Sequence, residues 1–273
     1  GKLVRVKTRS GRKTCATLSH SFLKRTSDSG IIPVKGSELK IGDYIPVIKQ
    51  APINKNTLYE FEGYELDKDF GWFIGTYLAD GNVNYNEVTI SKIIPEFYKR
   101  IIDTLYDLNI VAKYQQRDKR HNTYGPEGKT KFNDKKLSSF LIKHFGNGSE
   151  NKKISSFVFQ SNLDFISGII GGYFDGDGNF NHKEGKQMIR SSSISETLTE
   201  DMILLLSYFG IFGSKCVEKK VNHTIQIPRK YGKIFRDRIE LTVINKKSSL
   251  DIICSAKQPI QEFIGVIPEI SPL

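Results

Sequence analysis

The sequence predicts an α+β protein in which one αββαββα unit occurs twice, preceded by a small all-β segment. Residues 1–50 contain short alternating stretches separated by turn residues, which is typical of small β structure. After residue 59, apolar runs with helical spacing alternate with short extended stretches, and this order recurs. The pattern Asp-Gly-Asn-x-Asn begins at Asp80 and again at Asp177, a separation of 177 − 80 = 97 residues. That period is too long for a solenoid repeat and suits two halves related by pseudo-two-fold symmetry.

The first part of the chain is predicted to form β hairpins. Residues 3–8 and 14–18 alternate around a turn, and residues 31–35 and 44–48 have the composition of short strands. A polar stretch with a proline then separates them from the rest of the chain. We therefore assign residues 1–55 to the all-β segment.

The two halves are predicted over residues 56–160 and 161–273, the second including a C-terminal tail. In the first half we expect helices and strands, in chain order, at 67–78, 83–92, 95–108, 110–115, 129–132 and 137–145. In the second half we expect them at 163–174, 178–193, 197–209, 212–217, 224–227 and 230–239. Asp67 and Ser195 are placed to cap the helices that follow them.

Composition and charge favour a polyanionic partner and exclude several classes of protein. Lys and Arg exceed Asp and Glu by 41 − 30 = 11, and the pI is near 9.4, which favours nucleic acid. No apolar stretch approaches the roughly 20 residues of a membrane span, and no secretory leader is visible. The three widely spaced cysteines suit neither a disulfide framework nor a zinc site. We therefore expect a cytoplasmic protein with no membrane partner.

Two apolar helices of one design carry the functional signal. Residues 73–81 (Phe-Ile-Gly-Thr-Tyr-Leu-Ala-Asp-Gly) and 170–178 (Ile-Gly-Gly-Tyr-Phe-Asp-Gly-Asp-Gly) each have a small residue near the start and end in Asp-Gly. One such helix is common as a core helix with a glycine stop. Two copies, each followed by a strand and a helix, resemble the LAGLIDADG motif of homing endonucleases. The resemblance covers most of the chain after about residue 60.

The design has a physical reason. Small residues let two helices approach closely, and we expect Gly75 and the pair Gly171 and Gly172 at the pseudo-dyad. Asp80 and Asp177 would then meet at one edge and repel each other. A divalent cation relieves that repulsion, and oxygen ligands favour Mg²⁺, with Mn²⁺ as an alternative. The resemblance implies a metal site at Asp80 and Asp177 together with Gly81 and Gly178.

The resemblance also implies assisting lysines and has one departure. Residues 152–157 (Lys-Lys-Ile-Ser-Ser-Phe) resemble the K-x-I-P-x-F block of intein endonucleases, with serine in place of proline, and residues 245–248 resemble the later lysine block. Lys152 and Lys247 are thus expected to orient water or stabilise the phosphorane charge; a solvated surface lysine is the alternative. Leu78 stands where the family often has an acid. An EF-hand reading of residues 175–186 fails because Phe180 and Lys186 replace its glycine and glutamate.

In the resembled fold, each half presents a twisted sheet to the major groove of DNA. Alternate side chains of each strand reach the base edges or the phosphates. The expected DNA-binding residues are Asn82, Asn84, Asn86, Lys92, Arg117, Arg120, Lys129, Lys131, Asn179, Asn181, Lys183, Gln187 and Arg190. Since the two halves differ in sequence, the target is expected to be long and only partly palindromic.

The first fifty residues resemble blocks of the self-splicing domain of inteins, a partial Hint-like segment. Thr17 and His20 have the T-x-x-H form of the second splicing block, and residues 39–47 resemble the following L-x-x-G-D sequence. The family's nucleophile block and C-terminal His-Asn pair are not found, so we expect no splicing by this chain alone. The basic β segment either extends the DNA contact or serves as a stabilising layer.

These features favour a monomeric, Mg²⁺-dependent, site-specific endonuclease that acts on double-stranded DNA without an obligate protein partner. One alternative is a non-cleaving nucleic-acid binder, since some family members act as intron RNA maturases on the same scaffold. The other is an incomplete protein-splicing element. Mg²⁺-dependent nicking of DNA separates the first alternative from the endonuclease, and ligated product from a version with native flanks would support the second.

Overall fold

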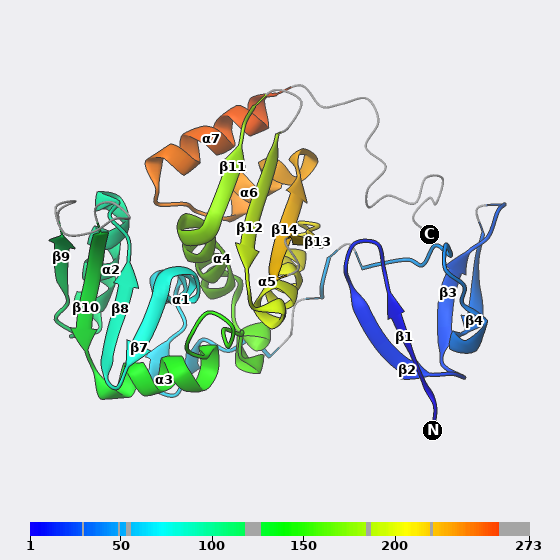
Figure 1. Cartoon of the computed structure of the whole chain (residues 1–273), viewed down its shortest axis with the longest axis horizontal. Helices are drawn as coiled ribbons and strands as arrows, with labels where there is room; N and C mark the ends of the chain where they lie inside the picture. Colours follow the sequence, from blue (N-terminus) through cyan, green and yellow to red (C-terminus); the bar gives the residue numbers. More distant parts are fainter. Residues whose placement is uncertain are drawn as a thin grey trace.

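The computed structural model describes residues 1–28, 30–48, 50–52, 56–117, 127–183, 187–218 and 221–256. Within these ranges no helix has the length and apolar character that crossing a membrane requires. The described residues form a mixed α+β body and an N-terminal all-β segment (Figure 1).

The N-terminal segment consists of two antiparallel hairpins, β1 (Leu3–Lys7) with β2 (Lys13–Thr17) and β3 (Ser21–Arg25) with β4 (Ile31–Lys35). A short 3-10 helix, η1 (Gly36–Glu38), follows. The predicted first hairpin is confirmed. The strand predicted at 44–48 is wrong: this stretch belongs to no sheet, and the carbonyl of Tyr44 accepts a single bond from the Arg25 amide at 2.9 Å. Pro46 removes a ladder donor from this stretch, which explains the difference.

In the first half, the expected unit follows a short hairpin whose two strands have two residues each. In chain order the elements are β5 (Glu60–Phe61), β6 (Tyr64–Glu65), α1 (Lys68–Asp80), β7 (Gly81–Asn84), β8 (Glu87–Ser91), α2 (Pro95–Asp107), β9 (Lys113–Arg117), β10 (Glu127–Asn133) and α3 (Lys135–Phe145). Asp67 caps α1, because its side chain accepts from the Phe70 amide at 2.7 Å. The single strand predicted at 83–92 is instead a hairpin, turned at Tyr85, whose φ is 54°.

The second half repeats this order. Its elements are η3 (Ser156–Gln160), α4 (Leu163–Asp177), β11 (Gly178–Asn181), β12 (Met188–Ser193), α5 (Glu196–Tyr208), β13 (Ser214–Glu218), β14 (Asn222–Pro228), η4 (Arg229–Tyr231), α6 (Gly232–Arg238) and α7 (Ile244–Ser255). The sheets have the equivalent orders β7-β8-β10-β9 and β11-β12-β14-β13. The predicted duplicated αββαββα fold is therefore confirmed, and α7 is an addition that the sequence did not predict.

Helices α1 and α4 pack against each other between the two sheets (Figure 1). A Cβ on Gly75 would overlap the Ile169 carbonyl and lie 2.7 Å from the Tyr173 amide, and a Cβ on Gly172 would lie 2.9 Å from the Thr76 amide. These two glycines therefore face the partner helix as predicted, and only glycine permits so close an approach.

Two further observations complete the helix interface. Gly71 and Gly168 also face the opposite helix, one turn before Gly75 and Gly172. Gly171, in contrast, faces the carbonyl of Glu240, so its predicted place at the pseudo-dyad is wrong. Consecutive helical residues point about 100° apart, so only one glycine of the pair can face α1.

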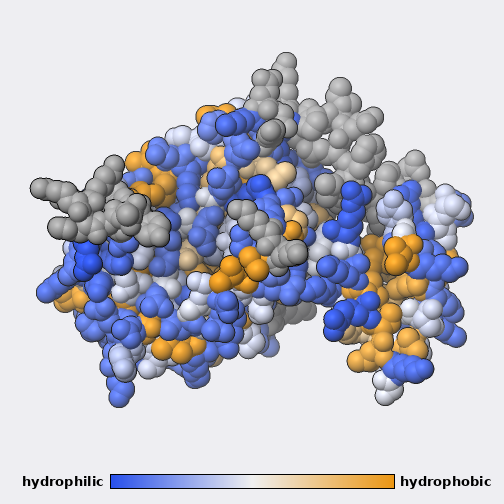
Figure 2. Space-filling model, viewed as in Figure 1, coloured by the Kyte–Doolittle hydropathy of each residue, from blue (hydrophilic) through white to orange (hydrophobic). Residues whose placement is uncertain are grey.

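The hydrophobic core belongs to the two halves rather than to the N-terminal segment. Trp72, Tyr77, Phe97, Phe165 and Tyr173 are among its fully buried side chains. Within residues 1–28 and 30–48, only two glycines are buried. Apolar side chains instead lie at the surface there (Figure 2); they include Leu3, Leu23, Ile32, Ile41 and Ile48.

The turn of the β1–β2 hairpin joins the N-terminal segment to the second half. The Lys215 amide donates to the Ser10 carbonyl at 2.9 Å, and the Arg12 guanidinium lies 4.0 Å from the centroid of the Phe212 ring. Lys13 pairs with Glu200 at 3.0 Å. Because Arg12 and Lys13 contact residues of the second half, this end of the basic segment packs against the rest of the chain in the structure.

Candidate active site at the ends of helices α1 and α4

The last residues of the two central helices are the predicted pair of carboxylates. Asp80 ends α1 and Asp177 ends α4. The two ends are in contact, since a Cβ placed on Gly176 would lie 2.8 Å from Oδ2 of Asp80. The structure therefore brings both predicted acids to one edge of the helix interface.

The charge of Asp80 affects the protonation of Asp177. Burial and, less strongly, the negative charge of Asp80 raise the pKa of Asp177 to about 7, while the charges of Lys92, Lys246 and Lys152 oppose the shift. Both acids also lie at the negative ends of helix dipoles. This edge therefore favours bound cations.

Lys92, which was expected to contact DNA, is held within the site. It follows β8, and its Nζ lies 2.8 Å from Oδ2 of Asp80 and donates to the Gly176 carbonyl at 3.0 Å. One ammonium group thus bridges the ends of both helices. The structure assigns Lys92 to the carboxylate edge, a role that the alternating pattern of a strand could not reveal.

Lys152 lies beside the end of α1, as expected for an assisting lysine. It is 3% exposed, its Nζ donates to the Tyr77 carbonyl at 2.8 Å, and it lies 3.2 Å from the centroid of the Tyr77 ring. Burial lowers the pKa of Lys152 to about 7, with the charge of Asp177 opposing the shift. It is therefore not the solvated surface lysine of the alternative interpretation.

The equivalent lysine of the second half is Lys246, where we had expected Lys247. The Nζ of Lys246 donates to the carbonyls of Phe174 at 2.9 Å, Asp175 at 2.6 Å and Gly176 at 2.9 Å. Burial and the nearby charge of Lys92 lower its pKa to about 8. Lys247 is exposed on the next position of α7, about 100° around the helix. Without knowledge of α7, the sequence could not decide between two adjacent lysines.

The two lysines occupy equivalent positions. Tyr77 lies three residues before Asp80, and Phe174 lies three residues before Asp177. Each carbonyl accepts from one lysine, buried Lys152 after α3 and partly buried Lys246 after α6. The pseudo-symmetry of the fold therefore extends to the side chains around the carboxylates.

Asp175 is a site residue that the sequence reasoning missed. Its carboxylate is fully buried and accepts from Trp72 Nε1 at 2.8 Å and from the amides of Thr242 at 2.7 Å and Val243 at 3.0 Å. Burial raises its pKa, and these bonds oppose the shift. The sequence did contain a signal for this role: Asp175 is an acid inside an otherwise apolar helix, at the position where the first half has Leu78.

The donors at this edge fit a hard divalent cation. The described residues contain no group of three or more His, Cys, Asp or Glu side chains that could hold a metal. Two carboxylates meet here, and oxygen donors suit Mg²⁺ or Mn²⁺. The Gly176 carbonyl beside them already accepts from Lys92 and Lys246. Gly81 and Gly178 directly follow the acids, and their amides donate to the Tyr77 and Phe174 carbonyls. Their role in metal binding stays a prediction.

Most expected DNA-binding residues of the first half share one face of its sheet. The register aligns Asn82 with Thr89 and Lys131, Asn84 with Glu87, and Lys129 with Gln115. Arg117 lies on the same face of β9, whereas Asn86 is exposed in the β7–β8 turn. Lys131 pairs with Glu87 at 2.9 Å and Lys129 with Glu127 at 3.2 Å. Arg120 lies outside the described residues.

The second sheet shows the same arrangement. Asn179 is aligned with Arg190, and Asn181 follows on the same face of β11. Arg190 pairs with Glu218. Lys183 is exposed beyond β11, and Gln187 accepts from Arg229 Nη1 at 3.2 Å. Both sheets thus present amide and basic side chains on one face, as the DNA-binding prediction requires.

Two other features lie apart from the carboxylates. Thr17 ends β2 and His20 precedes β3; both are exposed, and the His20 amide donates to the Thr17 carbonyl at 3.1 Å.

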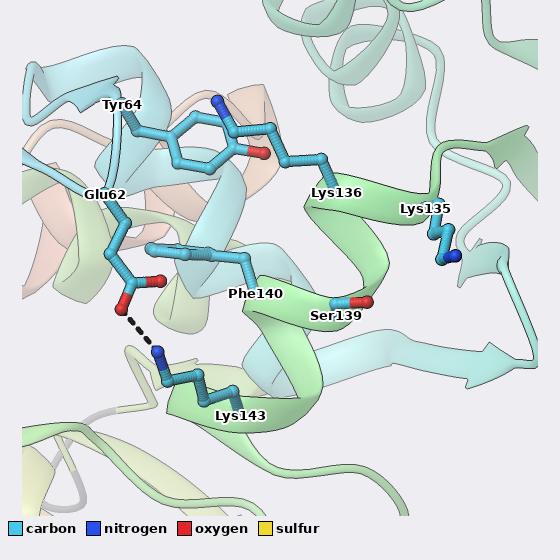
Figure 3. A pocket seen from close by; sticks show the side chains of 7 residues that line it. All are labelled: Glu62, Tyr64, Lys135, Lys136, Ser139, Phe140 and Lys143. Atoms are coloured by element: carbon cyan, nitrogen blue, oxygen red, sulfur yellow. Dashed lines mark hydrogen bonds and ion pairs between the residues drawn. The ribbon is translucent and has the colours of Figure 1, made fainter.

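A pocket over α3 is lined by Glu62, Tyr64, Lys135, Lys136, Ser139, Phe140 and Lys143 (Figure 3). In it Lys143 pairs with Glu62, and Lys136 Nζ lies 4.5 Å from the centroid of the Tyr64 ring. These charges are engaged in contacts within the protein.

Comparison with known proteins agrees with this geometry. Residues 164–250 match the family described as LAGLIDADG-like domain. This match lies in the second half, and residues 68–145 repeat the same order of elements, so the resemblance inferred from the two Asp-Gly helices is confirmed.

The curated relatives are longer than this chain. It is 36% identical over 99% of its length to the DNA-directed RNA polymerase subunit Rpo1C of Methanocaldococcus jannaschii, and covers 34% of that protein. It is 26% identical over 86% of its length to transcription initiation factor IIB of the same organism, and covers 31% of it. The chain therefore spans about a third of the length of these two curated relatives.

Solved structures share the fold at low identity. Full-length DUF199/WhiA from Thermatoga maritima has a TM-score of 0.52 and 13% identity, with 77% of this chain and 67% of that chain covered. I-DmoI in complex with DNA and Mn has a TM-score of 0.48 and 14% identity, with 64% and 97% covered.

Proposed function

We propose that this chain is a metal-dependent, site-specific endonuclease that cuts both strands of DNA at a long asymmetric target. The observation that supports it best is the meeting of Asp80 and Asp177 at touching helix ends, with three ammonium groups around them. Despite these ammonium groups the pKa of Asp177 stays raised, so a further cation at this edge would relieve the remaining cost of its charge. The charges suit a phosphodiester and a divalent metal.

The residues have distinct roles in the proposed reaction. Asp80 and Asp177 would hold Mg²⁺ or Mn²⁺, which when bound would polarise the phosphate and lower the pKa of a bound water. Lys152 and Lys246 each hold an ammonium group at the end of one helix, where it can stabilise negative charge on the phosphoryl oxygens. Lys92 neutralises Asp80 and joins the two helix ends.

The sheets would supply target recognition. Asn82, Asn179 and Arg190 lie on the faces that carry alternate, outward side chains, and amide or guanidinium groups can make bidentate contacts to base edges. Lys129 and Lys131 suit phosphate contacts. Since the two faces differ in sequence, we expect a non-palindromic target read by a monomer.

The N-terminal segment fits an intein origin. The chain matches a minor part of proteins as different as an RNA polymerase subunit and a transcription factor, which suits a module inserted into unrelated hosts. We propose that residues 1–55 are part of a Hint-like splicing domain carrying Thr17 and His20, followed by endonuclease halves at 56–160 and 161–273. The exposed apolar side chains of its hairpins suit a domain completed by further β structure.

A selection experiment tests the function. The wild type and an Asp80→Asn/Asp177→Asn variant are incubated with a randomised duplex library and Mg²⁺, and bound and cut molecules are sequenced. An Asp103→Asn/Asp107→Asn variant makes the same charge change at exposed positions of α2 and is the matched control. Cut ends from the wild type and the control alone would support the proposal and deliver the target.

The other outcomes are equally informative. Enrichment of bound duplexes without cut ends would establish a non-cleaving nucleic-acid binder. Equal cutting by the Asp80→Asn/Asp177→Asn variant would exclude the carboxylate edge as the active site.

A further inference from the structure

The two lysines beside the carboxylates, buried Lys152 and partly buried Lys246, are held in place by different acids. Lys246 lies in the first turn of α7, and the helix begins after Val243. The amides of Thr242 and Val243 both donate to Asp175, at 2.7 and 3.0 Å. Asp175 belongs to α4, the helix whose terminal carbonyls accept from Lys246. Asp175 therefore holds the start of the helix that carries the lysine, next to Glu96, which accepts from the Ile244 amide at 3.1 Å.

Lys152 has a corresponding anchor built from other residues. The Ile154 amide, two residues after Lys152, donates to Oδ2 of Asp201 at 3.1 Å. The carbonyl of Lys152 accepts from the Ser195 hydroxyl at 2.6 Å. Asp201 and Ser195 come from α5 and its N-cap. Burial raises the pKa of Asp201, and its bond to the Ile154 amide opposes the shift.

We propose that Asp175 and Asp201 are positioning residues, each of which places one lysine of the active site: Asp175 places Lys246 and Asp201 places Lys152. Neither carboxylate contacts the other's lysine segment in these bonds. The two half-sites can therefore be disturbed separately, although their terminal acids touch.

The contact of Asp175 with Trp72 extends this role across the pseudo-dyad. Trp72 lies on α1, and its Nε1 donates to Oδ2 of Asp175 at 2.8 Å. The same indole ring lies 4.6 Å from the Arg100 guanidinium, which donates to the Thr242 hydroxyl at 2.6 Å. Residues 242 and 243 are thus held by α4 directly and by α1 and α2 through Trp72 and Arg100. In the first half, Leu78 occupies the position of Asp175, so this anchor exists once.

The first test uses amine labelling and needs no DNA. Free protein is exposed to limiting acylating reagent, and modification of each lysine is measured by mass spectrometry. Asp175→Asn is expected to raise labelling of Lys246 severalfold with little change at Lys152, and Asp201→Asn to do the reverse. Exposed Lys247 serves as the internal reference. Unchanged labelling of Lys246 and Lys152, or an equal rise at both in either variant, would overturn the proposal.

A second variant keeps the test valid if Asp175→Asn fails to fold. Val243 has φ −69°, which proline adopts without strain, and proline removes the amide that donates to Asp175. Val243→Pro is expected to raise labelling of Lys246 as Asp175→Asn does. If Val243→Pro folds and leaves Lys246 protected, Asp175 does not act through this segment.

The second test rests on the proposed endonuclease function. A supercoiled plasmid carrying the selected duplex is cut, and each strand is followed with its own end label. Asp175→Asn and Asp201→Asn are each expected to slow one strand by roughly tenfold or more, on opposite strands, with DNA affinity unchanged. Equal slowing of both strands by each variant would indicate a merely structural role. If the wild type does not cut, the proposed function fails, and the labelling result still decides the positioning roles.

Discussion

The two half-sites share a backbone plan but differ in their charges. Each central helix ends in Asp-Gly, and in each a lysine donates to the carbonyl three residues before the acid. Asp80 is paired with Lys92, whereas the described residues give Asp177 no salt-bridge partner. The register aligns Gly81 with Ile90 and Gly178 with Ser191, so Ser193 holds the position equivalent to Lys92. Duplication thus preserved the packing, while the side chains around each acid diverged.

The helix interface is the feature that the halves share most closely, and disturbing it should produce the largest effect. Gly75→Ala and Gly172→Ala each place a Cβ within 3 Å of opposite backbone atoms. We expect each to lower the free energy of unfolding by about 3 kcal/mol or more, or to prevent folding. Gly232→Ala is the control, because its Cβ would make ordinary contacts at 3.5 Å. A small effect at only one of the two positions would break the equivalence of the helices.

Asp177 should make the metal-free protein less stable at neutral than at acidic pH. Its pKa is raised from 3.8 to about 7, so the folded state retains a proton that the unfolded state has lost. Stability therefore falls as the pH rises from about 4 to about 7. Lys152, with a pKa of about 7 instead of 10.5, has the opposite effect above pH 7.

Denaturant unfolding without metal measures this effect. Asp177→Asn is expected to raise the free energy of unfolding by about 1–3 kcal/mol at pH 8 and to change it little at pH 4. Asp103→Asn, at an exposed position, should leave the profile unchanged. If the free energy of unfolding of the Asp177→Asn variant depends on pH as that of the wild type does, ionisation of Asp177 does not lower the stability.

Lys92 should distinguish the half-sites during cleavage. Lys92→Met leaves Asp80 without its ammonium partner but removes nothing within hydrogen-bonding distance of Asp177. We expect the two strands of the selected duplex to be cut at rates that differ from the wild-type ratio by roughly tenfold, about 1.4 kcal/mol in activation free energy. Lys99→Met, at an exposed position of α2, is the control. An unchanged ratio of the two cleavage rates in Lys92→Met would show that Lys92 does not distinguish the two half-sites.

The N-terminal hairpin should contribute least. The side chain of Lys13 is 30% exposed and pairs with Glu196 and Glu200 of α5, so its ion pairs join the hairpin to the second half. Lys13→Met is expected to lower the free energy of unfolding by at most about 1 kcal/mol and to leave affinity for the selected duplex unchanged. A loss of affinity without a loss of stability would show that this segment contacts DNA.

Features repeated along the chain were predictable from the sequence, and features set by long-range contacts were not. Asp80, Asp177 and Gly75 were found because the Asp-Gly helices occur twice and because helix packing follows small residues. Lys246 was missed because α7 has no clear apolar periodicity, so the choice between adjacent lysines had no basis. Lys92 and Asp175 were missed because their partners lie on other elements, 84 residues away at Gly176 and 67 at Thr242.

Cleavage of the selected duplex by the wild type and by the Asp80→Asn/Asp177→Asn variant tests the central claim most directly, with both strands followed in Mg²⁺ at matched occupancy of the DNA. The structure predicts that the wild type cuts both strands, and that the variant binds the duplex but cuts neither. Undiminished cutting by the variant, or binding without cutting by the wild type, would contradict an active site built on these two carboxylates.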